Sequence, residues 1–325
     1  MATFLDGFFE LLVDLMIVYL MIAGGVIWRF SRYYSPKYGR WFTSIVIWIF
    51  FPISIISSFA GIGTLVGITV LQITLAAISV HGLSSLVMYI LVRNRPTEEA
   101  GSLVLCGTFP NALLFPFPII LAILGDNGLV YATIYVFIAM TLRNSLGVLI
   151  GIHYNPQARE YESQTQIGFN LVKDLLKFPP FLALLLGFFL HALFGPQAIG
   201  QIPGIDFFKT VSLYGALVLV GVSFQDIKNL HPRNLFSRNV IQVSFTRFMI
   251  GPAVAAFFII IFQSSRLIAI PLIIQSMAPP AVANILYGKF FNLDEGQISL
   301  LITSLTFLAL LILPFEVLLL QWIFL

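Results

Sequence analysis

Two hydrophobic segments interrupted by proline contain the residues best suited to bind a ligand. The first holds Pro110 and Asn111, and the second holds Pro279, Pro280 and Asn284. Proline inside a helix removes a backbone hydrogen bond and obstructs the carbonyl four residues earlier. Each break should therefore expose carbonyls at the end of one half-helix and N–H groups at the start of the next. The N–H ends carry partial positive charge and suit a carboxylate.

The side-chain amides of Asn111 and Asn284 lie next to these breaks. An amide in this position can contact a ligand, or it can only satisfy the broken backbone. We predict a ligand role for at least one of the two asparagines.

Arg143 and Arg247 lie inside apolar segments. An arginine at the centre of a membrane helix costs about 2.5–3.5 kcal/mol, so it normally faces protein or water and has a partner. One interpretation makes each arginine a counter-charge for an anionic substrate. The other makes it a structural tie to helix-end carbonyls or to a carboxylate such as Glu316. The sequence leaves both interpretations open.

Three further groups are candidates for carrying a coupling proton. Asp14 is the deepest of three acids spaced four apart, after Asp6 and Glu10, although a solvated helix end is the simpler interpretation. Glu316 is the only acid in the last apolar segment. His81 titrates near neutrality if it is hydrated, although a packed, hydrogen-bonded histidine is the simpler expectation.

Metal and cofactor chemistry is not expected. The 4 histidines have no metal-ligand spacing, and the single cysteine, Cys106, cannot build a zinc or iron–sulfur site. The sequence has no phosphate-binding loop and no paired nucleophile and base. We therefore predict no metal, no cofactor, no use of ATP within this chain and no enzymatic activity.

Membrane helices must position these residues. Of 325 residues, 59% are hydrophobic and 10% charged, and the mean hydropathy is +0.98, whereas soluble domains average about 25% charged residues. We predict an all-α integral membrane protein with ten transmembrane helices. The predicted spans are 8–30, 41–60, 64–91, 100–124, 129–152, 171–194, 208–224, 240–262, 267–290 and 296–325.

The charge distribution predicts how these helices are oriented. Most of the 17 lysines and arginines fall in the loops that follow odd-numbered spans. Positive loops stay in the cytoplasm, so both termini should lie outside the cell membrane and the loop 154–170 inside. The formal charge of +3 therefore sets topology, and no nucleic-acid partner is expected.

A weak internal repeat divides the chain. The turn Asp126-Asn127-Gly128 after span 4 is echoed by Asp294-Glu295-Gly296 after span 9, and the same offset places Pro110 on Ala278, beside Pro279. Because each copy has five spans, the second copy should be inverted, as in several transporter folds. The predicted parts are a first repeat at 1–153, a cytoplasmic loop at 154–170 and a second repeat at 171–325.

Several residues in spans 4, 9 and 10 match motifs of one known family. They are Asn111 and Pro118, with Leu113 and Pro116 in place of two glycines; Pro279 and Ala281, with Asn284 slightly displaced; and Thr303-Ser304-Leu305-Thr306 with Leu313-Pro314. By these motifs the chain resembles the auxin efflux carrier family, which includes the PIN exporters of plants and microbial malate and malonate carriers. The resemblance implies that broken helices 4 and 9 cross, that spans 1, 2, 6 and 7 form a scaffold, and that spans 3–5 and 8–10 form an elevator-type transport bundle. It also implies a homodimer that exports carboxylate-bearing metabolites.

The sequence thus predicts a secondary transporter of small organic anions, auxin-like or dicarboxylate, working by alternating access in the lipid bilayer. H⁺ or Na⁺ coupling stays open. One alternative is a sodium-coupled carrier of the bile-acid-symporter type on the same architecture. Another is a membrane receptor or lipid-binding protein that keeps the fold and binds a ligand without moving it.

Overall fold

The computed structural model describes residues 2–59, 67–155, 177, 179–200, 203–222, 224 and 230–324. In these ranges every regular element is a helix, and the one β-type pairing is an isolated bridge. The predicted loop 154–170 falls outside the described residues, apart from Tyr154 and Asn155. The helices are α1 (Ala2–Phe30), α2 (Pro36–Ile45), η1 (Val46–Phe50), α3 (Phe51–Ser58), α4 (Gly67–Val92), α5 (Thr97–Thr108), α6 (Pro116–Leu124), α7 (Asp126–Leu142), η2 (Arg143–Gly147), α8 (Val148–Tyr154), α10 (Pro179–Gly200), α11 (Ile205–Val222), α12 (Pro232–Leu235), α13 (Arg238–Phe245), η5 (Thr246–Ile250), α14 (Gly251–Ile261), α15 (Arg266–Ser276), α16 (Asn284–Phe290) and α17 (Glu295–Phe324).

The lengths and composition of these helices are those of a multi-pass membrane protein. Within the described ranges, 5 helical stretches are long and apolar enough to cross a membrane: Pro36–Ser58, Gly67–Val92, Asn127–Tyr154, Arg238–Ile261 and Glu295–Leu320. Shorter apolar helices are Met16–Phe30, Pro179–Gly195, Thr210–Val222 and Arg266–Ser276. The predicted spans at 100–124 and 267–290 are each divided into two short helices.

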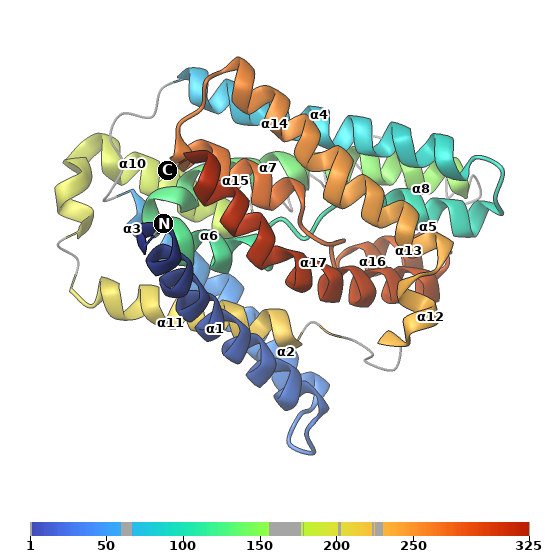
Figure 1. Ribbon diagram of the computed structural model, residues 1–325, viewed down its shortest axis with the longest axis horizontal. Helices are drawn as coiled ribbons and strands as arrows, with labels where there is room; N and C mark the ends of the chain where they lie inside the picture. Colours follow the sequence, from blue (N-terminus) through green and yellow to red (C-terminus); the bar gives the residue numbers. More distant parts are fainter. Residues whose placement is uncertain are drawn as a thin grey trace.

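Among the described helices, α1 and α11 share the most extensive contact, and they cross in the lower part of Figure 1. Gly25 and Gly221 meet at the crossing point. A Cβ atom on Gly25 would lie 2.1 Å from the carbonyl oxygen of Val218, and one on Gly221 would lie 2.1 Å from that of Ile22. Only glycine allows two helix backbones to approach this closely. Helix α10 packs against α3 beside this pair.

In the described part of the chain, three long helices contain a π-helical turn: η1, η2 and η5. The amide that directly follows η1, that of Phe51, donates a hydrogen bond to the Val46 carbonyl five residues earlier, and the amide of Gly251 after η5 donates to the Thr246 carbonyl in the same way. Proline follows each of these at positions 52 and 252, and a proline cannot continue the ordinary ladder. No proline follows η2, which begins at Arg143. Turns of this kind are frequent at functional sites.

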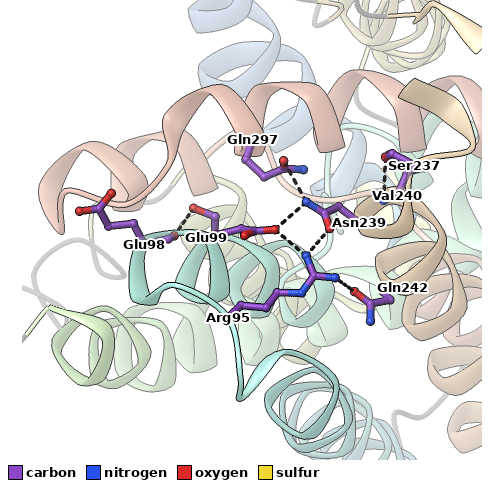
Figure 2. A network of polar contacts seen from close by, with 9 residues as sticks. Arg95, Glu98, Glu99, Ser237, Asn239, Val240, Gln242 and Gln297 are labelled. Carbon is purple, nitrogen blue, oxygen red and sulfur yellow. Dashed lines mark hydrogen bonds and ion pairs between the residues drawn. The ribbon is translucent and has the colours of Figure 1, made fainter. Parts of the chain in front are cut away.

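A second group of helices, α4, α5, α7, α14, α15 and α17, surrounds the two breaks, with α14 packed beside α4 (Figure 1). A polar network holds one end of this group together (Figure 2). Arg95, in the turn before α5, donates to Glu99 of α5, to Asn239 of α13 and to Gln242 of α13. Asn239 in turn donates to Glu99 and to Gln297 of α17. The network therefore connects three helices that are far apart in the sequence.

Candidate functional site

The two broken segments pair with each other at the centre of the second helix group. Pro110 and Pro280 form an isolated antiparallel bridge. The amide of Asn111 donates to the Pro279 carbonyl at 2.7 Å, and the amide of Ala281 donates to the Phe109 carbonyl at 3.0 Å. Two backbones that have left their helices thus satisfy each other, which is what allows irregular chain inside a membrane protein.

Asn284 lies at the first position of α16 and is fully buried, with 0% of its surface exposed. Its Nδ2 donates to the carbonyls of Leu105 and Phe109, at 3.4 and 3.2 Å. Leu105 lies in the last turn of α5, and Phe109 is the residue that directly follows this helix. The side chain of Asn284 therefore bonds one broken helix to the other.

Asn111 has a different environment, although both asparagines follow a proline break. Its Oδ1 accepts a hydrogen bond from the Leu114 amide at 3.2 Å, just before α6. The side chain is only partly buried, and no described residue accepts a hydrogen bond from its Nδ2. A donor therefore remains available at the crossover on Asn111, but not on Asn284.

Arg247 lies in η5 and is fully buried, with 0% of its surface exposed. Among the described residues, its guanidinium donates only to backbone carbonyls. Nε reaches Ala278 at 3.1 Å, Nη2 reaches Ser276 at 2.6 Å, and Nη1 reaches Gly107 and Thr108 at 3.4 and 3.3 Å. These four bonds use four of the five donors of the group. The sequence left two interpretations open for this arginine, a counter-charge for a substrate and a structural tie. The observed hydrogen bonds are those of a structural tie to helix-end carbonyls.

Gln275 is a further crossover residue that was not singled out from the sequence. It is fully buried near the end of α15. Its Nε2 donates to the carbonyl of Ala112, between α5 and α6, at 3.1 Å and to that of Ala132 in α7 at 2.9 Å. The clue in the sequence was a long polar side chain in an apolar segment, four residues before a proline pair.

Arg143 begins η2 and is half-buried. It follows the buried residues Ala132 and Val136 by about three and two helical turns, so it lies on their face of the helix. That face is turned toward α15, because Gln275 bonds the Ala132 carbonyl. No hydrogen bond or ion pair joins the Arg143 guanidinium to any residue in the described ranges.

The surroundings of Arg143 connect it to the crossover. The next residue, Asn144, accepts a hydrogen bond from the Tyr287 hydroxyl at 2.6 Å. One turn further, a Cβ atom on Gly147 would lie 3.2 Å from the Phe109 ring and 3.3 Å from the Tyr287 ring. Arg143 therefore lies about one helical turn before Gly147, the residue that approaches the Phe109 ring at the start of the first break.

The remaining candidates are dispersed. His81 is fully buried in α4, bonds the Ala77 carbonyl through Nδ1 at 2.7 Å, and packs between the rings of Phe109 and Tyr135. Glu316 is partly buried in α17, and its Oε1 has no partner in the described part of the chain. No ion pair joins Glu316 to Arg143 or Arg247 in these ranges. The side chain of Asp14 lies outside the described set.

The start of α6 offers fewer N–H groups than an ordinary helix. Pro116 and Pro118 have no amide hydrogen, and the Phe117 amide donates to the Leu113 carbonyl at 3.2 Å. The prediction that half-helix amides attract an anion therefore relies here on the helix dipole and on side chains. In the described residues, no group of three or more His, Cys, Asp or Glu side chains could hold a metal.

A multi-pass helical protein with two broken helices paired at its centre belongs to the class of membrane carriers. The family of membrane transport proteins, which includes the auxin efflux carriers, matches residues 10–317 of this chain. The chain belongs to that family, as the motifs around the two breaks indicated. The family consists of transporters and not of enzymes. No curated protein matches the chain.

Proposed function

We propose that the protein is a secondary transporter of small organic anions that works by alternating access around the crossover of its two broken segments. The observation that carries this proposal is the position of Arg143 and its lack of hydrogen bonds to described residues. This residue is an intramembrane cation next to the crossover, and it makes no hydrogen bond or ion pair with any described residue, whereas Arg247 uses nearly all its donors on carbonyls. An unpaired arginine in a membrane protein is retained at a cost, and an anionic substrate offsets that cost when it binds.

The chemistry available near Arg143 suits a carboxylate. The guanidinium presents a planar set of donors that can bind both oxygens of the group. The Nδ2 of Asn111 adds a neutral donor at the crossover, and the dipole of α6 adds a partial positive charge. Auxin-like acids and dicarboxylates such as malate are the substrate classes that the family resemblance implies.

The proposed mechanism requires two inverted repeats, and the helix boundaries support them. The repeated turns at Asp126 and Asp294 are 168 residues apart. Adding this offset to α5 (Thr97–Thr108) gives 265–276, which nearly coincides with α15 (Arg266–Ser276). The same shift moves α4 (Gly67–Val92) to 235–260, which overlaps α13 to α14 (Arg238–Ile261). We accordingly assign the repeats to 1–153 and 171–325, with ten spans and both termini outside.

We propose a division into two bodies, which contact each other through α3 against α7 and α11 against α6. Helix α1 packs on α11 and α10 packs on α3, in spans 1, 2, 6 and 7. Helices α4, α5, α7, α14, α15 and α17 pack on one another in spans 3–5 and 8–10. In the proposed mechanism the first set is the scaffold of a homodimer, and the second set carries the substrate across the membrane. Glu316, whose Oε1 is buried without a described partner, is the proposed site of proton coupling.

Uptake of radiolabelled malate and indole-3-acetate into proteoliposomes tests the proposal. Arg143→Gln should weaken binding of the transported acid by about 10- to 100-fold, because a charged hydrogen bond contributes about 1.5–3 kcal/mol. Arg238→Gln, which removes an exposed cation at the start of α13, is the control and should transport normally. Saturable binding without any flux would instead make the protein a receptor. Full activity of Arg143→Gln would refute the role given to this residue.

A further inference from the structure

The two helix halves that end at the crossover direct their free carbonyls at a single point. Gly107 and Thr108 come from the end of α5, and Ser276 and Ala278 come from the end of α15 and the residues after it. We define these four carbonyl oxygens as the carbonyl cage. All four accept hydrogen bonds from Arg247, at 2.6 to 3.4 Å.

Oxygen cages of this composition are typical cation sites. In carriers with broken helices, unwound carbonyls and the C-terminal ends of half-helices coordinate the coupling sodium ion or proton. Neutral backbone oxygens suit a hard monovalent cation, because they replace its hydration shell without a formal negative charge. In this chain the guanidinium of Arg247 already occupies the cage.

We infer that Arg247 is a built-in cation that takes the place of a coupling metal ion, so that the carbonyl cage does not bind sodium. The inference rests on the proposed function, since it specifies how that transporter is coupled. It also changes the expectation for Arg247, which then stabilises the crossover and does not contact the substrate.

The charge balance of the cage supports this inference. A helix C-terminus carries about half of an elementary negative charge, so the ends of α5 and α15 together carry about one. The single positive charge of Arg247 balances them. No carboxylate bonds Arg247 among the described residues, so a sodium ion added beside it would have no negative group left to compensate its charge. The buried site would repel it, because burial strengthens such interactions.

Thermal melting of the purified protein in detergent tests the inference without any transport measurement. The wild-type Tm should be the same in sodium chloride and in choline chloride at equal ionic strength. Arg247→Ala should lower the Tm, because it empties the cage. Low millimolar guanidinium chloride should then raise the Tm of Arg247→Ala in a saturable manner, as a ligand that fills the vacated site would. Guanidinium should not stabilise the wild type or Arg238→Ala, which serves as the control.

Two results would overturn the inference. One is a saturable rise of the wild-type Tm with sodium that choline and potassium do not reproduce. The other is guanidinium stabilising Arg238→Ala as strongly as Arg247→Ala. If Arg247→Ala does not fold, Arg247→Lys is the second variant, because it keeps the charge. The Tm of Arg247→Lys should not change with sodium, and a rise of its Tm with sodium would also count against the inference. Sodium-stimulated uptake would overturn the inference and leave the proposed transport intact, whereas a sodium-indifferent protein that moves no organic acid would overturn the transport proposal alone.

Discussion

The two asparagines of the crossover should respond differently to the same substitution. Asn284→Ala removes two buried hydrogen bonds, to the carbonyls of Leu105 and Phe109. Each such bond contributes about 0.5–1.5 kcal/mol, so the loss of stability should be about 1–3 kcal/mol. Neither carbonyl loses its only donor, because Leu105 also accepts from the Phe109 amide and Phe109 accepts from the Ala281 amide. The larger penalty of a completely unpaired buried group therefore does not apply.

Asn111→Ala removes one hydrogen bond, to the Leu114 amide before α6. A single hydrogen bond contributes about 0.5–1.5 kcal/mol, so the stability effect should be the smaller of the two. The same substitution removes the Nδ2 donor that no described residue uses. Substrate binding should therefore weaken more in Asn111→Ala than in Asn284→Ala.

Thermal melting and equilibrium unfolding in SDS give the stability of both variants, and substrate titration of the same preparations gives their affinity. We expect Asn284→Ala to lose mainly stability and Asn111→Ala to lose mainly affinity. The opposite order would refute the reasoning, since it would mean that buried Asn284 binds the ligand and that Asn111 only caps the backbone.

Two further predictions concern packing away from the crossover. Gly221→Ala should destabilise the α1–α11 pair by about 1–3 kcal/mol, as overpacking does, because its Cβ would lie 2.1 Å from the Ile22 carbonyl oxygen. Gly24→Ala is the matched control, with nothing within 4 Å of the added atom, and equal Tm values for the two variants would contradict the proposed close contact. Arg95→Ala should cost about 1 kcal/mol, since it removes the centre of the network in Figure 2. The exposed neighbour Arg93→Ala should leave the SDS unfolding midpoint unchanged, and an equal shift in both would show that the network does not stabilise the bundle.

The breaks in the two segments were predictable because proline acts locally. Pro110 and the pair Pro279-Pro280 end helices wherever they stand in an apolar run, and the structure has non-helical chain at both places. Membership of the family of membrane transport proteins was also predictable, because the residues that resemble its motifs lie at or near these breaks, and the family matches residues 10–317.

The partners of individual side chains were not predictable, because they depend on register between distant helices. The sequence gives no reason for Asn284 to reach back to Leu105 and for Asn111 to bond only three residues ahead. Both follow from where the two breaks pair. The π-helical turn at η2 was equally hidden, since no proline follows it.

The contrast between the two arginines follows from geometry that composition cannot reveal. Both lie in apolar helices, and the sequence left the same two roles open for each. Two helix C-termini meet at one point, so one cation is sufficient to balance them, and Arg247 supplies it. Under the 168-residue offset its counterpart in the first repeat is Ser79 of α4, which is neutral. A second cation at that position would exceed what the two helix ends can compensate. Arg143 makes no such hydrogen bonds among the described residues, and for this reason we propose Arg143, and not Arg247, as the arginine that binds the substrate.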